Sequence, residues 1–329
     1  MRLREVTVTE IHANEVVDCA QYEALRQAGG AIELTNRSLL EVAGPDALTY
    51  LQNLVTNDVE KLAEGSGCYA ALLTVKGKIL ADLRILRYAD RVLVDLESTT
   101  LHRVVKAASA YSIGYQVDVS DRSNDLSQSM VVGPRAREII GVAVPEVEHS
   151  FVHVTLAGAQ CTAVAANHGL PGVDVLCARA DRRAVFQELL DRGAVSVTKT
   201  VVECLRIEAG LPRYDVDMSD DTFLQEVGIH KYAVSFTKGC YVGQEPVARM
   251  YHRGHPNRYL RGARLSEPAA VGSELLFNGK EVGRLTSCTL SPRFGPIALA
   301  IVRREVAPGN YVSVGTAASS AKITELPFS

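Results

Sequence analysis

Short apolar runs separated by glycine, proline and polar residues recur along the whole chain. Residues 68–74 and 79–86 are apolar enough to form two strands, and Lys76 and Gly77 between them predict a hairpin turn. Residues 98–110 place apolar side chains three and four positions apart, which indicates a helix with one buried face. This part of the chain therefore predicts a sheet with helices packed on it.

The same order of elements returns further along the chain. A short strand and a helix at 130–140 precede three strand patterns between 151 and 178, and a helix follows at 181–192. We predict two α+β units, each an antiparallel sheet with helices on one face. The first thirty residues are mixed in character and predict an arm or loose helix that packs on the body.

The last part of the chain has a different pattern. From residue 258 short strands alternate with turns, Asn278 and Gly279 predict a hairpin turn, and no long amphipathic helix occurs. We therefore divide the chain into a larger region, 1–255, and a small antiparallel β-barrel domain, 256–329.

Composition narrows the class of protein. The chain has 329 residues, 47% of them hydrophobic and 22% charged, which is typical of a globular protein with two or three domains. A net charge of -3 predicts no general affinity for nucleic acid or for an anionic membrane. No apolar run is long enough to cross a bilayer, and the first residues lack the apolar core of a signal peptide. We expect a cytoplasmic monomer.

Cysteine spacing argues against both a disulfide framework and a metal centre. The count is odd and no Cys-x-x-Cys occurs, so most of these residues are expected to pack in the core. The seven are Cys19, Cys68, Cys161, Cys177, Cys204, Cys240 and Cys288.

Residues 237–249 concentrate chemically active side chains around one thiol. Cys240 lies between Gly239 and Gly243, and Lys238, two positions upstream, would favour its thiolate. The same stretch supplies an amide, a carboxylate and a guanidinium, from Gln244, Glu245 and Arg249. A surface loop with an incidental cysteine is the alternative, but this density of polar groups favours a functional loop.

Two carboxylates elsewhere stand in unusual places. Asp82 lies inside the strand predicted at 79–86, where an acid is usually a solvated surface residue. Glu208 lies near the end of a helical run that stops at Gly210, where a carboxylate is unfavourable against the helix dipole. It is either a tolerated surface residue or one with a specific partner.

Two segments carry a family resemblance. The string Lys-Gly-Cys-Tyr-Val-Gly-Gln-Glu at 238–245 resembles the signature of the YgfZ-type folate-binding proteins. These are relatives of the glycine-cleavage T-protein, an aminomethyltransferase, and they act in maturing or repairing iron–sulfur proteins. The string Arg-Ile-Glu-Ala-Gly-Leu-Pro at 206–212 is similar to a second family segment. The resemblance runs from residue 31 to the C-terminus and implies the T-protein fold, with two ferredoxin-like lobes around a folate site.

The resemblance also implies roles for individual residues. Asp82, five positions after Gly77, matches the acid that contacts folate and assists aminomethyl transfer. Glu208 matches the residue that binds the pteridine ring, where a carboxylate can accept parallel N–H donors. Cys240 would be the reactive group, with Lys238 holding it as thiolate. Further folate or loop contacts would come from Arg249, Gln244 and Glu245.

Three functions remain open at this point. The first is a tetrahydrofolate-binding protein that supports assembly or repair of iron–sulfur proteins through Cys240, with those proteins as partners. The second is an aminomethyltransferase, favoured by Asp82, that moves a one-carbon unit from a lipoyl-bound aminomethyl group to folate. The third is a folate-binding module without chemistry. The basic run from Arg249 to Arg264 is either a solvated linker or a surface for folate carboxylates or an acidic partner.

Overall fold

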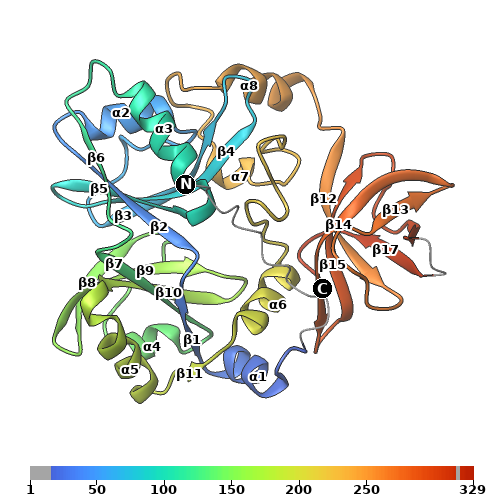
Figure 1. Ribbon diagram of the computed structural model, residues 1–329, viewed down its shortest axis with the longest axis horizontal. Helices are drawn as coiled ribbons and strands as arrows, with labels where there is room; N and C mark the ends of the chain where they lie inside the picture. Colours follow the sequence, from blue (N-terminus) through green and yellow to red (C-terminus); the bar gives the residue numbers. More distant parts are fainter. Residues whose placement is uncertain (1–15, 316–318) are drawn as a thin grey trace, which may run out of the picture.

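The computed structural model describes residues 16–315 and 319–329, which form two α+β lobes and a closed β-barrel (Figure 1). The predicted α+β class and the C-terminal antiparallel barrel are confirmed. Of the predicted N-terminal arm, residues 1–15 lie outside the described residues. The remainder includes helix α1 (Cys19–Gln27), whose first turn is capped by the Asp18 side chain accepting from two backbone N–H groups.

The first lobe is a five-stranded antiparallel sheet in the order β3-β4-β5-β2-β6. Its strands are β2 (Arg37–Ala43), β3 (Ser66–Leu73), β4 (Ile79–Arg87), β5 (Arg91–Glu97) and β6 (Asp118–Asp121). Helices α2 (Ala47–Leu54) and α3 (Leu101–Tyr111), the latter preceded by the 3-10 turn η1 (Ser98–Thr100), cover one face and bury a core of leucine, valine and tyrosine side chains. The hairpin predicted around residues 76–77 is present as β3–β4.

The second lobe is a six-stranded sheet in the order β11-β1-β7-β10-β9-β8. Its strands are β1 (Gly30–Leu34), β7 (Leu126–Val132), β8 (Phe151–Leu156), β9 (Ala159–Asn167), β10 (Pro171–Ala178) and β11 (Val195–Ser196). Its outer face is covered by α4 (Ala136–Ile140) and α5 (Arg182–Asp191), which follows the turn η2 (Arg179–Asp181). The opposite face meets α1 and α6 (Lys199–Ala209).

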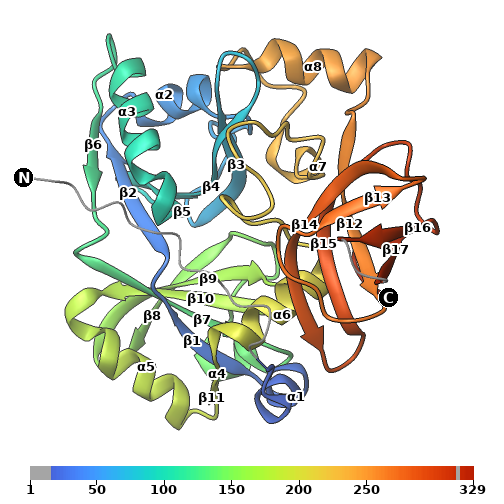
Figure 2. The ribbon, with the colours of Figure 1, turned by 45° about the vertical axis from the view of Figure 1, so that its right-hand side comes forward.

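The two lobes are interleaved at the start of the chain. Strand β1 pairs with β7 of the second sheet, whereas β2, only three residues later, pairs with β5 of the first. Figure 2 shows the chain passing from one lobe to the other between these two strands. Neighbouring strands in the sequence thus belong to different sheets, which periodicity alone does not reveal.

The barrel closes in the order β12-β15-β14-β13-β16-β17. Its strands are β12 (Arg258–Leu265), β13 (Glu274–Phe277), β14 (Lys280–Ser291), β15 (Gly295–Arg303), β16 (Tyr311–Val314) and β17 (Ser320–Thr324). Asn278 and Gly279 both have positive φ, so the predicted hairpin turn between β13 and β14 is confirmed. Helices α7 (His230–Ala233) and α8 (Gln244–Arg253) lie in the segment that leads to the barrel.

One mixed core joins the three bodies. It combines Leu73 and Ile79 of the β3–β4 hairpin with Ile207 of α6 and with Leu260 and Leu299 of the barrel. Helix α6 runs between the second lobe and the barrel (Figure 1). The hairpin, α6 and the barrel therefore hold one another in place.

Buried charges join the inner faces of the two lobes. The Arg84 guanidinium of β4 contacts Asp95 Oδ2 of β5 at 2.6 Å and also pairs with Asp174 of β10. Asp95 Oδ1 accepts from Arg37 Nε at 2.8 Å, and Asp174 Oδ1 lies 2.9 Å from His168 Nε2. Asp95 and Asp174 are both 1% exposed, so each buried carboxylate is matched by donors from two residues.

We expect the change Arg84→Met to destabilise the protein by about 3–5 kcal/mol, because it leaves two buried carboxylates without their shared cation. Urea denaturation of the variant and the wild type measures the difference. Adding Asp174→Asn to Arg84→Met should recover part of the loss, since one of the unpaired charges is then removed.

Arg284→Met is the matched control. Arg284 also pairs with two carboxylates, Glu274 and Glu281, but these pairs are exposed on the barrel. Its loss should cost no more than about 1 kcal/mol. Equal losses for Arg84→Met and Arg284→Met would contradict a structural role for the buried network.

Candidate functional site

Asp82 projects from β4 onto the inner face of the first lobe, beside Tyr69 of β3. In the β3–β4 register Asp82 lies opposite Ala71 and Tyr69 opposite Arg84, so Asp82 and Tyr69 are diagonal neighbours on one face. The Tyr69 hydroxyl donates to Asp82 Oδ2 at 2.9 Å. Asp82 Oδ1 is enclosed and has no hydrogen-bond partner. The carboxyl therefore has one satisfied oxygen and one that is free to bind a donor.

Burial raises the pKa of Asp82 above its ordinary value, although Arg37 and the Tyr69 hydroxyl act in the opposite direction. Arg37 cannot neutralise it fully, because its guanidinium is bonded to Asp95 and to Glu97 Oε1 at 3.3 Å. Burial also raises the pKa of Glu97, and the nearby charge of Asp82 raises it further. A carboxyl with a raised pKa is suited to give or take a proton at a bound small molecule.

Glu208 is buried at a junction rather than exposed on the surface of α6. Its carboxylate accepts from the Tyr22 hydroxyl of α1 at 2.9 and 3.0 Å, and Arg26 lies 3.5 Å away. The Cys204 thiol donates to it at 3.6 Å, and Ser291 of β14 donates from the barrel. The surface alternative for Glu208 is therefore wrong, and a specific set of partners offsets its unfavourable place near the helix end.

These partners bear on the expected folate contact of Glu208. Both of its oxygens are already bonded within the protein, so a pteridine ring would have to displace a donor such as Tyr22 or Ser291. The described contacts do not join Glu208 to Asp82. The contact of Glu208 with folate stays a prediction.

Lys238 anchors the cysteine loop to the end of α2. Its ammonium donates to the backbone oxygens of Gln52, Val55 and Asn57, the last two at 2.7 and 2.8 Å. The carbonyls of Gln52 and Val55 lie at the end of α2, where a helix leaves carbonyls without partners, and that of Asn57 lies just beyond it. Burial lowers the pKa of Lys238 to about 8. The expected pairing of Lys238 with Cys240 has no counterpart in these contacts, which use all three of its donor positions.

The loop beyond Lys238 is pressed against the β3–β4 turn and leaves Cys240 exposed. Gly243 has a φ of 80°, and a Cβ there would come within 2.4 Å of Thr74 O. Gly77 in the turn has a φ of 75° and faces Pro246, so both contacts require glycine. The β3–β4 hairpin thus carries Asp82 on its inner face, and the Cys240 loop packs against its turn with the cysteine exposed.

The remaining loop residues lie on α8. Glu245 and Arg249 are exposed and form an ion pair with each other, one helical turn apart. This contact agrees with the expectation that Arg249 binds within the loop itself. Gln244 is half-buried at the start of the helix.

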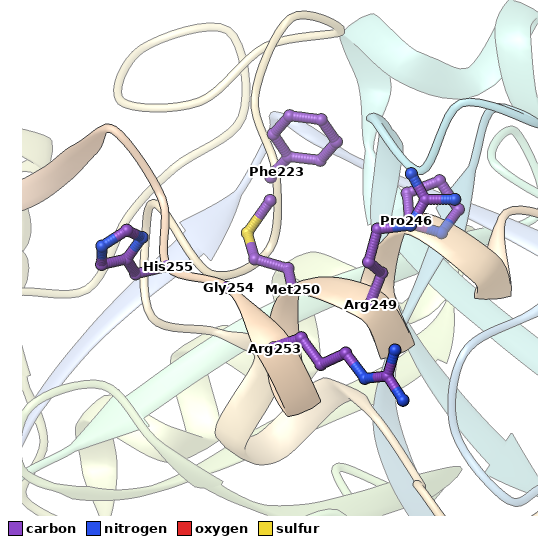
Figure 3. Close-up of a pocket in the computed structure, with 7 residues that line it drawn as sticks. All are labelled: Phe223, Pro246, Arg249, Met250, Arg253, Gly254 and His255. Atoms are coloured by element: carbon purple, nitrogen blue, oxygen red, sulfur yellow. The ribbon is translucent and has the colours of Figure 1, made fainter.

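A surface pocket of about 320 Å³ lies beside α8 (Figure 3). Met250 and Phe223 approach each other across it, while the Arg253 guanidinium points away. Asp82, Glu208 and Cys240 are absent from its lining, whereas Arg249, an expected folate or loop contact, belongs to it. The lining residues are Phe223, Pro246, Arg249, Met250, Arg253, Gly254 and His255. In the described part of the chain, no group of three or more His, Cys, Asp or Glu side chains could hold a metal ion.

Sequence reasoning missed Tyr69, Arg37 and Glu97, which surround Asp82. A signal was present, because Arg37 and Glu97 are charged residues at the ends of strands that read as apolar. Their meeting depends on the pairing of β2 with β5, which places Arg37 directly opposite Glu97.

Comparison with known proteins gives a consistent result. Residues 12–238 match the GCVT N-terminal domain, and residues 258–329 match the glycine cleavage T-protein C-terminal barrel domain. An aminomethyltransferase of Rubrobacter xylanophilus is 28% identical over 324 residues, covering 94% of this chain and 85% of the relative. A putative chloroplastic transferase of Arabidopsis thaliana is 26% identical over 306 residues, covering 90% and 70%.

A solved structure supports the fold. The glycine cleavage system aminomethyltransferase T from Bartonella henselae superposes with a TM-score of 0.85 at 22% identity, covering 94% of this chain and 89% of that one. None of the helices in the described residues is both long and apolar enough to span a membrane.

We expect Asp82→Asn to stabilise the protein as the pH rises. Because the pKa of Asp82 is raised in the folded state, the unfolded chain loses this proton first, and the wild type loses stability between about pH 4 and that raised pKa. The amide does not titrate, so the advantage of Asn should develop across this window and stay constant above it. Urea denaturation from about pH 4 to pH 8 measures it. A difference in stability between variant and wild type that stays the same from about pH 4 to about pH 8 would contradict the raised pKa.

Proposed function

The chain belongs to the glycine cleavage T-protein family, and from this premise we propose that it binds tetrahydrofolate and supports assembly or repair of iron–sulfur proteins through Cys240. Within the family, our proposal assigns the chain to the YgfZ-type proteins, whose cysteine signature residues 238–245 resemble. We propose that it acts in the cytoplasm with iron–sulfur client or assembly proteins as partners.

The observation that carries this proposal is the exposure of Cys240 on an anchored loop. Lys238 fixes the base of the loop to α2, and Gly243 fixes its far side to the β3–β4 turn. A thiol presented in this way can meet a group on another protein, whereas a buried thiol cannot. The sequence has no Cys-x-x-Cys, and no group of three or more His, Cys, Asp or Glu side chains among the described residues could hold a metal ion. We therefore assign Cys240 transient chemistry rather than a resident iron–sulfur cluster.

Asp82 is the residue that best fits the folate. Its unpaired Oδ1 offers an acceptor to a nitrogen-bound hydrogen of the ligand, and Tyr69 holds the other oxygen in place. Tetrahydrofolate would supply a nitrogen that carries or accepts a one-carbon unit. In this proposal Glu208 contacts folate only after losing one of its present hydrogen-bond donors. Arg249, Gln244 and Glu245 support the loop around Cys240.

Aminomethyl transfer is the second candidate, and Asp82 is the specific observation that favours it. A carboxyl with a raised pKa can hold a proton at the reacting nitrogen and release it as the carbon unit moves. Positioning of folate against this group would supply the rest of the rate enhancement. The same residues, without turnover, would make a folate-binding module.

We expect Cys240→Ala to abolish support of iron–sulfur enzymes, because it removes the exposed thiol and leaves the Asp82 region untouched. The measurement is the activity of iron–sulfur enzymes in cells where the variant replaces the wild-type chain, together with tetrahydrofolate binding by the purified protein. Cys19→Ala is the matched control, since Cys19 is the other exposed cysteine among the described residues. Normal activities of the iron–sulfur enzymes in cells with Cys240→Ala would contradict the proposed iron–sulfur role.

Asp82→Asn separates the two candidates. We expect it to weaken tetrahydrofolate binding about tenfold, the loss of one charge-assisted hydrogen bond. Under the iron–sulfur proposal, the wild type shows no transfer from an aminomethyl-loaded lipoyl carrier protein to tetrahydrofolate. Clear turnover that Asp82→Asn lowers by about 10²–10⁴-fold would instead establish the aminomethyltransferase. Unchanged folate binding in Asp82→Asn would remove Asp82 from the folate site under either function.

A further inference from the structure

The β9–β10 hairpin places two cysteines across from each other. The pairing runs from Pro171 opposite Asn167 to Leu176 opposite Thr162. The next position lies inside both strands and sets Cys177 opposite Cys161. Opposite residues of an antiparallel pair have Cα atoms about 4.5–5.5 Å apart, which is within the range of about 4.4–6.8 Å that a disulfide spans.

The two side chains point to the same side of the sheet. Both belong to the core beneath α4 and α5, together with Ala163 and Val175 from the same two strands. The interaction between the two thiols lowers the pKa of Cys161 and raises that of Cys177. The Cys161 thiol also lies 3.6 Å from Ala159 O. One sulfur is therefore the better nucleophile, and its neighbour keeps its proton.

We propose that Cys161 and Cys177 are an oxidative modification site at which hydrogen peroxide converts the dithiol to a cross-strand disulfide. The Cys161 thiolate attacks one peroxide oxygen, the O–O bond breaks, and a sulfenic acid forms as hydroxide leaves and is protonated to water. The Cys177 sulfur then attacks the Cys161 sulfur, its proton passes to the departing hydroxyl, and a second water leaves. Two thiols and one peroxide thus give one disulfide and two waters.

The position of the pair allows a small oxidant to reach it. Cys161 and Cys177 are 3% and 4% exposed, but the adjoining Gln160 and Ala178 are exposed. Both strands are paired on each side, so peroxide reaches the thiols only when the ends of β9 and β10 open locally, an event smaller than unfolding of the lobe. Peroxide suits this site better than a bulky disulfide such as oxidised glutathione. Among the described cysteines, no second pair lies opposite each other in paired strands.

The Cys161–Cys177 disulfide would affect the buried charge network that connects the two lobes. It would close the hairpin that contains His168 and Asp174, the two residues at one end of the buried charge network. A closed loop restricts the unfolded chain and so raises the stability of the folded lobe. This inference stands independently of the folate and iron–sulfur proposals.

The test treats the native full-length protein with hydrogen peroxide, blocks free thiols with an alkylating agent in denaturant, and analyses the peptides by mass spectrometry. We expect a peptide that links Cys161 to Cys177, lighter by two hydrogens than the separate peptides and split by dithiothreitol. The melting temperature should rise by roughly 5 °C and return after reduction.

Two variants make the outcome decisive. Cys177→Ser should lose both the linked peptide and the rise in melting temperature, while Cys288→Ser, a half-buried cysteine in the barrel, should keep both. Full alkylation of Cys161 and Cys177 after peroxide treatment would overturn the proposal. Oxidation of Cys161 to an acid without the link, or a link formed only in unfolded protein, would do the same.

Discussion

The arrangement of the two lobes depends on a row of buried charges. Arg84 bridges Asp95 of its own sheet and Asp174 of the other, and Arg37 and His168 extend the row at its two ends. Removing such groups from water is costly, and the pairing offsets that cost only while every member stays in place. The row therefore tolerates little sliding of one sheet over the other. Apolar contacts between the lobes do not impose this precision, because hydrophobic packing is not directional.

The same row explains the state of Asp82. Arg37 is the cation that acts on Asp82, but its guanidinium is already bonded to Asp95 and Glu97. Asp82 is thus the carboxyl left without a cation of its own, and burial raises its pKa. An unpaired buried acceptor lowers stability unless something binds to it. A buried carboxyl with an unpaired oxygen, beside cations that are bonded to other carboxylates, has the features expected of a site prepared for a ligand.

The local elements of this fold follow from the sequence, but its long-range contacts do not. Strand and turn patterns predicted the β3–β4 hairpin and the turn at Asn278 and Gly279, because both depend on neighbouring residues. Glu208 could be recognised as unusual, yet its partner Tyr22 lies 186 residues away. Lys238 was expected to face Cys240 because the two are close in sequence. Its ammonium instead binds carbonyls at and just beyond the end of α2, which are close only in the folded chain.

The β3–β4 hairpin links the two candidate centres without merging them. Asp82 lies on its inner face as a half-buried carboxyl with one unpaired oxygen. The Cys240 loop presses on its turn, through Gly243 on one side and Gly77 against Pro246 on the other. A shift of this turn must move the loop, since neither glycine has room for a side chain. Under the proposed function, this turn is the connection through which folate at Asp82 would act on the exposed thiol at the surface.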